Sequence, residues 1–284
     1  MTVLTGKSTI VQLCEEAIQK TAKLTAAGIK PCLAILRVGE KPDDIYYENS
    51  AVKRMEGIGI AVRQIHKPEA TTTEQLILEL EKLNVDASVH GVLLLMPLPA
   101  HIDAAAVKAS LSPKKDIDCL TAENMAKIYA DDSTGFAPCT PAAVMALLQC
   151  NSIDLRGKNV TVIGRSLVVG KPLSMLLLSK NATVTICHSR TKDLAAVCRQ
   201  ADILIAAVGR ARMVNANFVK PGAVVIDVGI NVDEKGQMCG DVDFDAVAEI
   251  AEAVTPVPGG IGGITTAVLA QNLLKAAELQ ADPL

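Results

Sequence analysis

The sequence predicts an α/β protein: two αβα domains with parallel-rich sheets flank a cleft, and the C-terminal domain is Rossmann-like. Its 284 residues exceed one minimal domain and suit two. Half the residues are hydrophobic but only 2% are aromatic, so the cores must consist of Val, Ile, Leu and Ala. Such cores suit buried parallel strands covered by helices. Short apolar runs also alternate with helical patterns, which is the order of βαβ units.

The first half of the chain is expected to hold three strands separated by helices. Pro42 and the aspartates after it start a helix that Gly57 ends. Thr72 and Gln75 form a capping pair at the start of the next helix. The expected elements are a strand at 31–38, a helix at 43–57, a strand at 60–66, a helix at 72–84 and a strand at 91–96.

The segment Pro-Cys-Thr-Pro at 138–141 interrupts the pattern of strands and helices, and a second series of elements follows it. A long apolar helix is expected from about 265 and would pack back across the first domain. We therefore expect a first domain at 1–140, completed by the C-terminal helix 268–284, and a Rossmann-like domain at 141–267. The second series comprises helix 143–149, strand 159–164, a helix from 171, strand 182–187, helix 192–201, strand 203–208 and strand 223–229.

Charge and hydropathy exclude several classes of function. The net charge is −3 without a long block of either sign, so the basic footprint of a nucleic-acid-binding protein is absent. No stretch approaches the roughly 18–20 apolar residues of a membrane span. The N-terminus lacks a basic region followed by an apolar one, as a secretory signal would have. We expect a cytoplasmic protein that binds neither nucleic acid nor membrane.

The eight cysteines are scattered, without a CxxC pair or a disulfide framework spacing. In a chain without a secretory signal they are expected to be small buried or partly buried thiols. The four histidines also lack the spacing of metal ligands. We expect no metal site.

Residues 160–172 have the order strand, glycine turn, helix start that a nucleotide site requires. Glycine lets the backbone approach a pyrophosphate, and the helix N-terminus offers N–H groups to the phosphates. Gly164, Ser166 and Gly170 give the spacing G-x-S-x-x-x-G instead of G-x-G-x-x-G. The segment alone therefore leaves open an ordinary glycine-rich β–α turn.

The end of the following strand distinguishes between the two nicotinamide dinucleotides. An NAD-binding unit places an acid there, about 20 residues past the glycines, for the ribose 2′-hydroxyl. Here Ser189 and Arg190 occupy that place, in the acid-free run 187–191. A hydroxyl and a guanidinium suit a 2′-phosphate, and Arg165 in the turn is a further candidate cation. The alternative is a solvated polar loop; we favour NADP.

Seven short motifs, taken in order, carry a resemblance to a known family. They are KDID at 115–118, PCTP at 138–141, GRS with VGxP at 164–172, HS at 188–189, DVGIN at 227–231, GDVD at 240–243 and TPVPGGIG at 255–262. Over essentially its whole length the chain resembles the methylenetetrahydrofolate dehydrogenase/methenyltetrahydrofolate cyclohydrolase family.

The resemblance implies an NADP-dependent enzyme of one-carbon metabolism, usually a homodimer. Such enzymes oxidise 5,10-methylenetetrahydrofolate by hydride transfer to the nicotinamide, and many then hydrolyse the methenyl product to 10-formyltetrahydrofolate. Tyr47 would face the folate, and Asp118 would accept hydrogen bonds from the pterin. Residues implied for the NADP site are Gly164, Arg165, Ser166, Ser189 and Ile230, and the turn Pro258, Gly259, Gly260 would approach the reacting centre.

The chain departs from the family where a Tyr-x-x-x-Lys pair faces the folate and the lysine serves the hydrolase step. Alignment on the flanking glycines places Ala51 at the lysine position. Lys53 lies about 200° round the helix from it and is expected on the surface. Leu95, among the residues of the folate site, replaces the glutamine that would bind that lysine. Both members of one polar pair are thus apolar here.

Hydride transfer needs mainly alignment of the two reacting carbons, whereas water attack on the methenyl carbon needs proton handling. We therefore expect a dehydrogenase with weak or absent cyclohydrolase activity. Two alternatives stay open. One is a fully bifunctional enzyme that uses Lys53, Tyr47 or ordered water; the other is a non-catalytic binding protein, which the retained glycine loop and Asp118 argue against.

Overall fold

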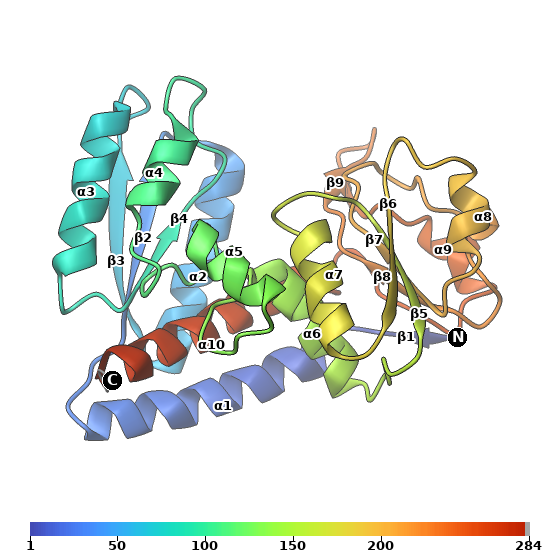
Figure 1. The fold of residues 1–284 in the computed structure, drawn as a ribbon, viewed down its shortest axis with the longest axis horizontal. Helices are drawn as coiled ribbons and strands as arrows, with labels where there is room; N and C mark the ends of the chain where they lie inside the picture. Colours follow the sequence, from blue (N-terminus) through green and yellow to red (C-terminus); the bar gives the residue numbers. More distant parts are fainter. Residues whose placement is uncertain (282–284) are drawn as a thin grey trace. The chain divides into compact units, whose positions relative to one another are not determined.

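The computed structural model describes residues 1–281 and divides into two compact units (Figure 1). The six-stranded unit comprises residues 1–11 and 138–265, and the three-stranded unit comprises residues 12–137 and those from 266 onward. Both have parallel sheets with helices, so the predicted α/β class is confirmed. Two helices have residues in both units: α1 (Lys7–Ala26) and α10 (Gly262–Ala281).

The six-stranded unit is built on a wholly parallel sheet in the order β1-β11-β8-β7-β5-β6. β5 lies between β6 and β7, so the chain reverses its direction of winding there, as in doubly wound folds. The strands are β1 (Thr2–Val3), β5 (Asn159–Ile163), β6 (Thr183–Cys187), β7 (Ile203–Ala206), β8 (Val224–Asp227) and β11 (Ala253–Val254).

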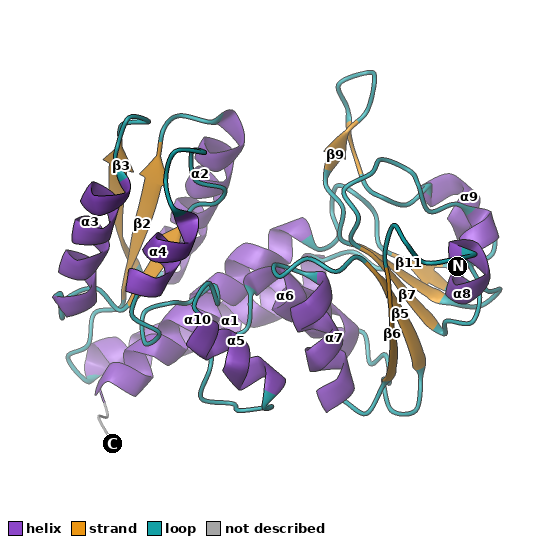
Figure 2. Cartoon of the chain, turned by 45° about the horizontal axis from the view of Figure 1, so that its top comes forward, coloured by secondary structure: helices purple, strands orange, loops and turns teal. Residues whose placement is uncertain are grey.

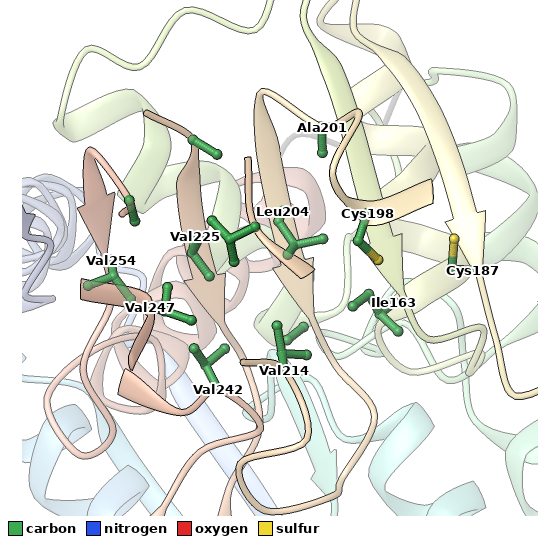
Figure 3. Close-up of a cluster of buried hydrophobic side chains, with 14 residues drawn as sticks. Ile163, Cys187, Cys198, Ala201, Leu204, Val214, Val225, Val242, Val247 and Val254 are labelled. Atoms are coloured by element: carbon green, nitrogen blue, oxygen red, sulfur yellow. The ribbon is translucent and has the colours of Figure 1, made fainter. Parts of the chain in front are cut away.

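Small aliphatic side chains form a core of this unit, as the composition predicts. Leu204 and Val225 on neighbouring strands pack with Val247 of α9 and with Cys198 of α8 (Figure 3). The remaining elements are α6 (Cys139–Cys150), α7 (Gly170–Ser179), α8 (Leu194–Cys198), the 3-10 turn η1 (Ala216–Phe218), α9 (Phe244–Ala248) and the antiparallel pair β9 (Asn231–Val232) and β10 (Met238–Cys239).

The three-stranded unit has the parallel order β3-β2-β4, with helices on both faces of the sheet (Figure 2). Alternate residues of a strand point to opposite faces. Leu36 and Leu94 pack with Leu80 of α3 on one face. The elements are β2 (Cys32–Val38), α2 (Pro42–Ile58), β3 (Ala61–Lys67), α3 (Thr73–Val85), β4 (Gly91–Leu94), α4 (Ala104–Ser110) and α5 (Ala122–Tyr129).

The expected strands and long helices are present, with boundaries shifted by a few residues. The capping pair at α3 is confirmed: Gln75 N donates to Thr72 Oγ1 at 3.3 Å, and Thr72 N donates to Gln75 Oε1 at 3.0 Å. α6 begins four residues earlier than expected, and α8 covers only five of the ten expected residues. The last residues of the expected C-terminal helix, 282–284, lie outside the described part.

Several short elements were not expected, among them β1, β11, α4, α5 and α9. β1 is two residues long and pairs with β11, some 250 residues away in sequence. This pairing places residues 1–11 in the six-stranded unit, whereas we assigned them to the first domain. A two-residue strand carries no periodic pattern, because its partner alone defines it.

All eight cysteines are free thiols, as expected. Over residues 1–281, no group of three or more His, Cys, Asp or Glu side chains could hold a metal ion. In the same range, no helix is long and apolar enough to cross a membrane.

Candidate functional site

The residues predicted for the cofactor follow the carboxyl ends of three strands of the six-stranded sheet. Gly164 to Ser166 follow β5, Ser189 and Arg190 follow β6, and Ile230 follows β8. The strands are parallel, so these segments lie at one edge of the sheet. Arg165, Ser166, Ser189, Arg190 and Ile230 are all exposed there, and ligands bind at this edge in open α/β sheets.

The turn after β5 requires glycine at two positions. Gly164 has φ +136°, and a Cβ atom there would overlap the carbonyl oxygen of Ala207. A Cβ atom at Gly170 would overlap the carbonyl oxygen of Gly164. Ser166 Oγ accepts a hydrogen bond from Val169 N at 3.0 Å, just before α7 begins. The turn thus brings exposed backbone to a helix N-terminus, which fits a pyrophosphate.

The loop after β6 is ordered by its own hydrogen bonds. His188 N donates to Thr191 Oγ1 at 2.9 Å, and Arg190 N donates to His188 Nδ1 at 3.1 Å. The next acid along the chain, Asp193, accepts a hydrogen bond from Ala196 N as the N-cap of α8. Ser189 and Arg190 are exposed, and residues 187–192 around them contain no acid, so the loop fits a 2′-phosphate.

A buried carboxylate at the end of β8, Asp227, was not given a role by sequence reasoning. It accepts hydrogen bonds from the backbone N–H groups of Gly229 at 2.9 Å, Asp241 at 3.0 Å and Val242 at 2.9 Å. Burial raises the pKa of Asp227 to about 6, against the lowering by these donors, and the Asp241 carboxylate raises it further. Asp227 lies in the motif DVGIN and Asp241 lies in the motif GDVD. Their contact joins residues 14 positions apart, so no local pattern in the sequence predicts it.

The three-stranded unit holds Tyr47, Leu95 and Asp118. Tyr47 is half-buried on α2, Leu95 is buried directly after β4, and Asp118 is half-buried in a loop. The loop is held by Asp116, which sequence reasoning also left without a role. Asp116 accepts from Leu120 N at 2.8 Å and from Thr121 N at 2.8 Å and Oγ1 at 2.6 Å.

Ala51 lies on the inner face of α2 and is completely buried, whereas Lys53 is exposed, as the helical spacing predicts. Leu95 N donates to Leu36 O at 3.0 Å, so Leu95 continues the ladder of β4 beside Arg37 of β2. Leu95 and Arg37 therefore project from the same face of the sheet.

A charged cluster that the sequence did not predict lies between α2 and this face. Arg37 Nε donates to Glu48 Oε2 at 2.7 Å, and Arg37 also donates to Gly39 O. Gln64 Nε2 donates to Glu48 Oε1 at 3.0 Å, and His66 Nε2 lies 2.7 Å from the same oxygen. Burial raises the pKa of Glu48, but hydrogen bonds from His66, Gln64 and Arg37 outweigh it and hold the pKa below its usual range. Both oxygens of Glu48 are thus occupied.

The turn at Pro258, Gly259 and Gly260 belongs to the six-stranded unit. Gly259 has φ +106°, and its carbonyl oxygen accepts from Gly6 N at 2.9 Å. A Cβ atom at Gly260 would lie 2.6 Å from Pro256 O. The turn therefore requires both glycines, and Pro258 and Gly259 are exposed.

Two family models cover most of the chain. Residues 4–118 match the catalytic domain of tetrahydrofolate dehydrogenase/cyclohydrolase, and residues 138–281 match its NAD(P)-binding domain. The bifunctional protein FolD of Clostridioides difficile is 50% identical over 278 residues, which are 98% of this chain and 97% of that protein.

Solved structures give the same result. FolD of Campylobacter jejuni, a methylenetetrahydrofolate dehydrogenase/cyclohydrolase, matches with a TM-score of 0.96 and 41% identity over 98% of this chain and 99% of its own. The Trypanosoma brucei enzyme, solved with NADP and an inhibitor, matches with a TM-score of 0.93 and 33% identity over 99% and 98%. The chain belongs to the tetrahydrofolate dehydrogenase/cyclohydrolase family.

Proposed function

We propose that this chain is an NADP-dependent methylenetetrahydrofolate dehydrogenase of one-carbon metabolism. The observation that carries the proposal is the edge of the six-stranded sheet, where the glycine turn and the acid-free Ser189–Arg190 loop lie together. The cofactor supplies the hydride acceptor when bound. The methylene carbon loses a hydride, and the substrate is left as the methenyl cation.

The protein's own contribution to this step is binding and alignment. Backbone N–H groups after Gly164 and the hydroxyl of Ser166 would hold the phosphates, and Asp118 would accept hydrogen bonds from the donor edge of the pterin. We assign Tyr47 and Leu95 of the three-stranded unit to the folate. Hydride transfer needs no proton donor at position 51, so this step is compatible with Ala51.

The cyclohydrolase step to 10-formyltetrahydrofolate is proposed to be weak or absent. It requires proton handling, and Ala51 and Leu95 offer no polar group. Glu48, one helical turn before position 51, has its carboxylate occupied by Arg37, Gln64 and His66. The alternative is a fully bifunctional enzyme that uses Tyr47, Lys53 or ordered water. Following NADPH and methenyl-tetrahydrofolate absorbance together distinguishes the two, because methenyl product accumulates only when hydrolysis is slow.

Preference for NADP over NAD is expected to depend on Ser189. Ser189→Asp should shift kcat/KM toward NAD, because the carboxylate repels a 2′-phosphate and accepts from a free 2′-hydroxyl. Asn181→Asp adds the same charge to the exposed turn before β6, at the strand's other end, and should leave the preference unchanged. Equal or better kcat/KM with NAD in the unmodified protein would falsify the assignment.

Asp118→Ala is expected to reduce the affinity for folate strongly and to leave the affinity for NADP unchanged. Loss of charge-assisted hydrogen bonds should reduce kcat/KM for methylenetetrahydrofolate about ten- to over a hundredfold. NADP binding, measured by calorimetry, and the unfolding midpoint serve as controls. Normal kcat/KM in a folded Asp118→Ala protein contradicts the pterin role.

Ala51→Lys combined with Leu95→Gln is expected to raise methenyl hydrolysis. General acid–base groups typically contribute about 10²–10⁴-fold, so even an imperfectly placed lysine should be detectable, whereas the dehydrogenase rate should change far less. The glutamine is needed because a lysine facing Leu95 would be partly desolvated without a partner.

Two results would refute this explanation of the weak hydrolase step. One is robust cyclohydrolase activity in the unmodified enzyme that disappears in Lys53→Ala. The other is no gain in a double variant whose unfolding midpoint shows that it is well folded. Lys53→Ala alone is the matched control and should change neither activity, because Lys53 is exposed.

We further propose a homodimer that forms at the β6 edge of the six-stranded sheet. Among the described residues β6 pairs only with β5, and Ile186 on it and Leu178 on α7 are 39% and 56% exposed. Edge strands with apolar neighbours favour association. Light scattering should give the mass of a dimer for the unmodified protein and the mass of a monomer for Ile186→Glu. Val85→Glu, at an exposed site in the other unit, should remain a dimer. A monomer in the unmodified protein, or a dimer that persists in Ile186→Glu, contradicts this surface.

We also propose a cytoplasmic location, since eight free thiols suit a reducing compartment. Cell fractionation is the check.

A further inference from the structure

A second buried carboxylate, Asp241, joins two of the segments that leave the sheet beside the glycine turn. Its Oδ2 atom accepts from Val208 N at 2.6 Å and from Gly209 N at 3.1 Å, in the segment after β7. Its Oδ1 atom accepts from Arg210 N at 2.8 Å and from Asn231 Nδ2 at 2.9 Å, the latter in the segment after β8. Asp241 thus holds the two segments by four hydrogen bonds.

Asp241 is completely buried, and the backbone is packed directly against it. A Cβ atom at Gly229 would overlap the carboxylate of Asp241, and one at Gly240 would overlap the carboxylate of Asp227. Asp241 therefore packs against Gly229, and Asp227 packs against Gly240. Asp227 also accepts a hydrogen bond from Asp241 N. Because every donor comes from the protein, this carboxylate serves the arrangement of the segments and has no direct access to a ligand.

The position of these segments indicates which part of the dinucleotide they meet. The chain reverses its winding between β5 and β7, and dinucleotides bind across such a point at the carboxyl edge. The 2′-phosphate, on the adenosine half, is assigned to the loop after β6, on one side of β5. The nicotinamide half then extends to the other side, over the ends of β7 and β8, where Ile230 is 62% exposed.

We propose that Asp241 is a positioning residue that fixes the segments 207–210 and 228–231 beneath the nicotinamide half of NADP. The inference rests on the proposed NADP-dependent function. The cofactor site then has two parts. The glycine turn and the loop after β6 hold the adenosine half of NADP, and the segments that depend on Asp241 hold the nicotinamide half.

Asp241→Asn tests the proposal with little change of shape. Each oxygen of Asp241 faces two N–H groups, so an amide NH₂ in either orientation would face two donors and lose both hydrogen bonds. Binding should be measured by calorimetry with two probes, NADP and 2′,5′-ADP, which carries only the adenosine half.

The expected result is a loss of NADP affinity of about tenfold or more, with 2′,5′-ADP affinity unchanged within about twofold. At saturating NADP the kcat of the dehydrogenase should also fall, because the alignment for hydride transfer is disturbed. Asp202→Asn is the matched control. Asp202 accepts from Asn159 N at 2.9 Å and Lys220 Nζ at 2.7 Å at the opposite edge of the same sheet, and its replacement should change neither affinity.

Equal losses for both probes in Asp241→Asn would overturn the proposal, because Asp241 would then support the unit as a whole. Unchanged NADP affinity and kcat would overturn it as well. If Asp241→Asn does not fold, Asn231→Ala removes one of the four donors and should give a smaller loss for NADP alone; no selective loss there is the negative result. Failure of the proposed function is distinguishable, since the unmodified protein would then bind neither probe.

Discussion

The carbonyl oxygen of Ala207 lies where a side chain at residue 164 would project, and the candidate cofactor site depends on this close approach. It sets the turn after β5 against the segment after β7, so two neighbouring strand ends are fixed with respect to each other. Gly170 meets the carbonyl of Gly164 in the same way, which brings the start of α7 onto the turn. The turn that we propose for the phosphates can form there only because both positions lack a Cβ atom.

The buried pair Arg37–Glu48 imposes a different constraint on the three-stranded unit. Removing one member of such a pair leaves an uncompensated charge, so the two residues must be retained or replaced together. The pair fixes the first half of α2 against β2, and Tyr47 is the residue next to Glu48. It also affects the region around Ala51: a lysine introduced there would lie one helical turn from Glu48, whose acceptors already bind Arg37, Gln64 and His66. For this reason Leu95→Gln belongs in the same variant, where it offers the new ammonium group a different acceptor.

The sequence was sufficient for the fold class and for the long elements, because their periodicity is local. It was also sufficient for the exposure of Lys53, which follows from helical spacing alone. The short strand β1 and the roles of Arg37 and Asp241 could not be obtained in this way. Arg37 and Glu48 are 11 residues apart, and Asp241 binds backbone more than 30 residues before it. Contacts of this kind depend on the packed sheet, and a single sequence has no local pattern that records them.

The segment Lys115 to Asp118 shows how burial divides roles among adjacent charged residues. Lys115 Nζ donates to Leu83 O and Asp86 O, both at 2.7 Å, at the C-terminus of α3. Asp116 is 1% exposed, and its carboxylate accepts from the loop it holds. A carboxylate whose oxygens already accept from backbone and side-chain donors, as those of Asp116 do, cannot take a ligand's hydrogen bonds without breaking the loop. Asp118 is half-buried, which supports its assignment to the pterin in preference to Asp116. The two aspartates of the motif are therefore not equivalent: Asp116 fixes the loop, and Asp118 is the one that we propose for the substrate.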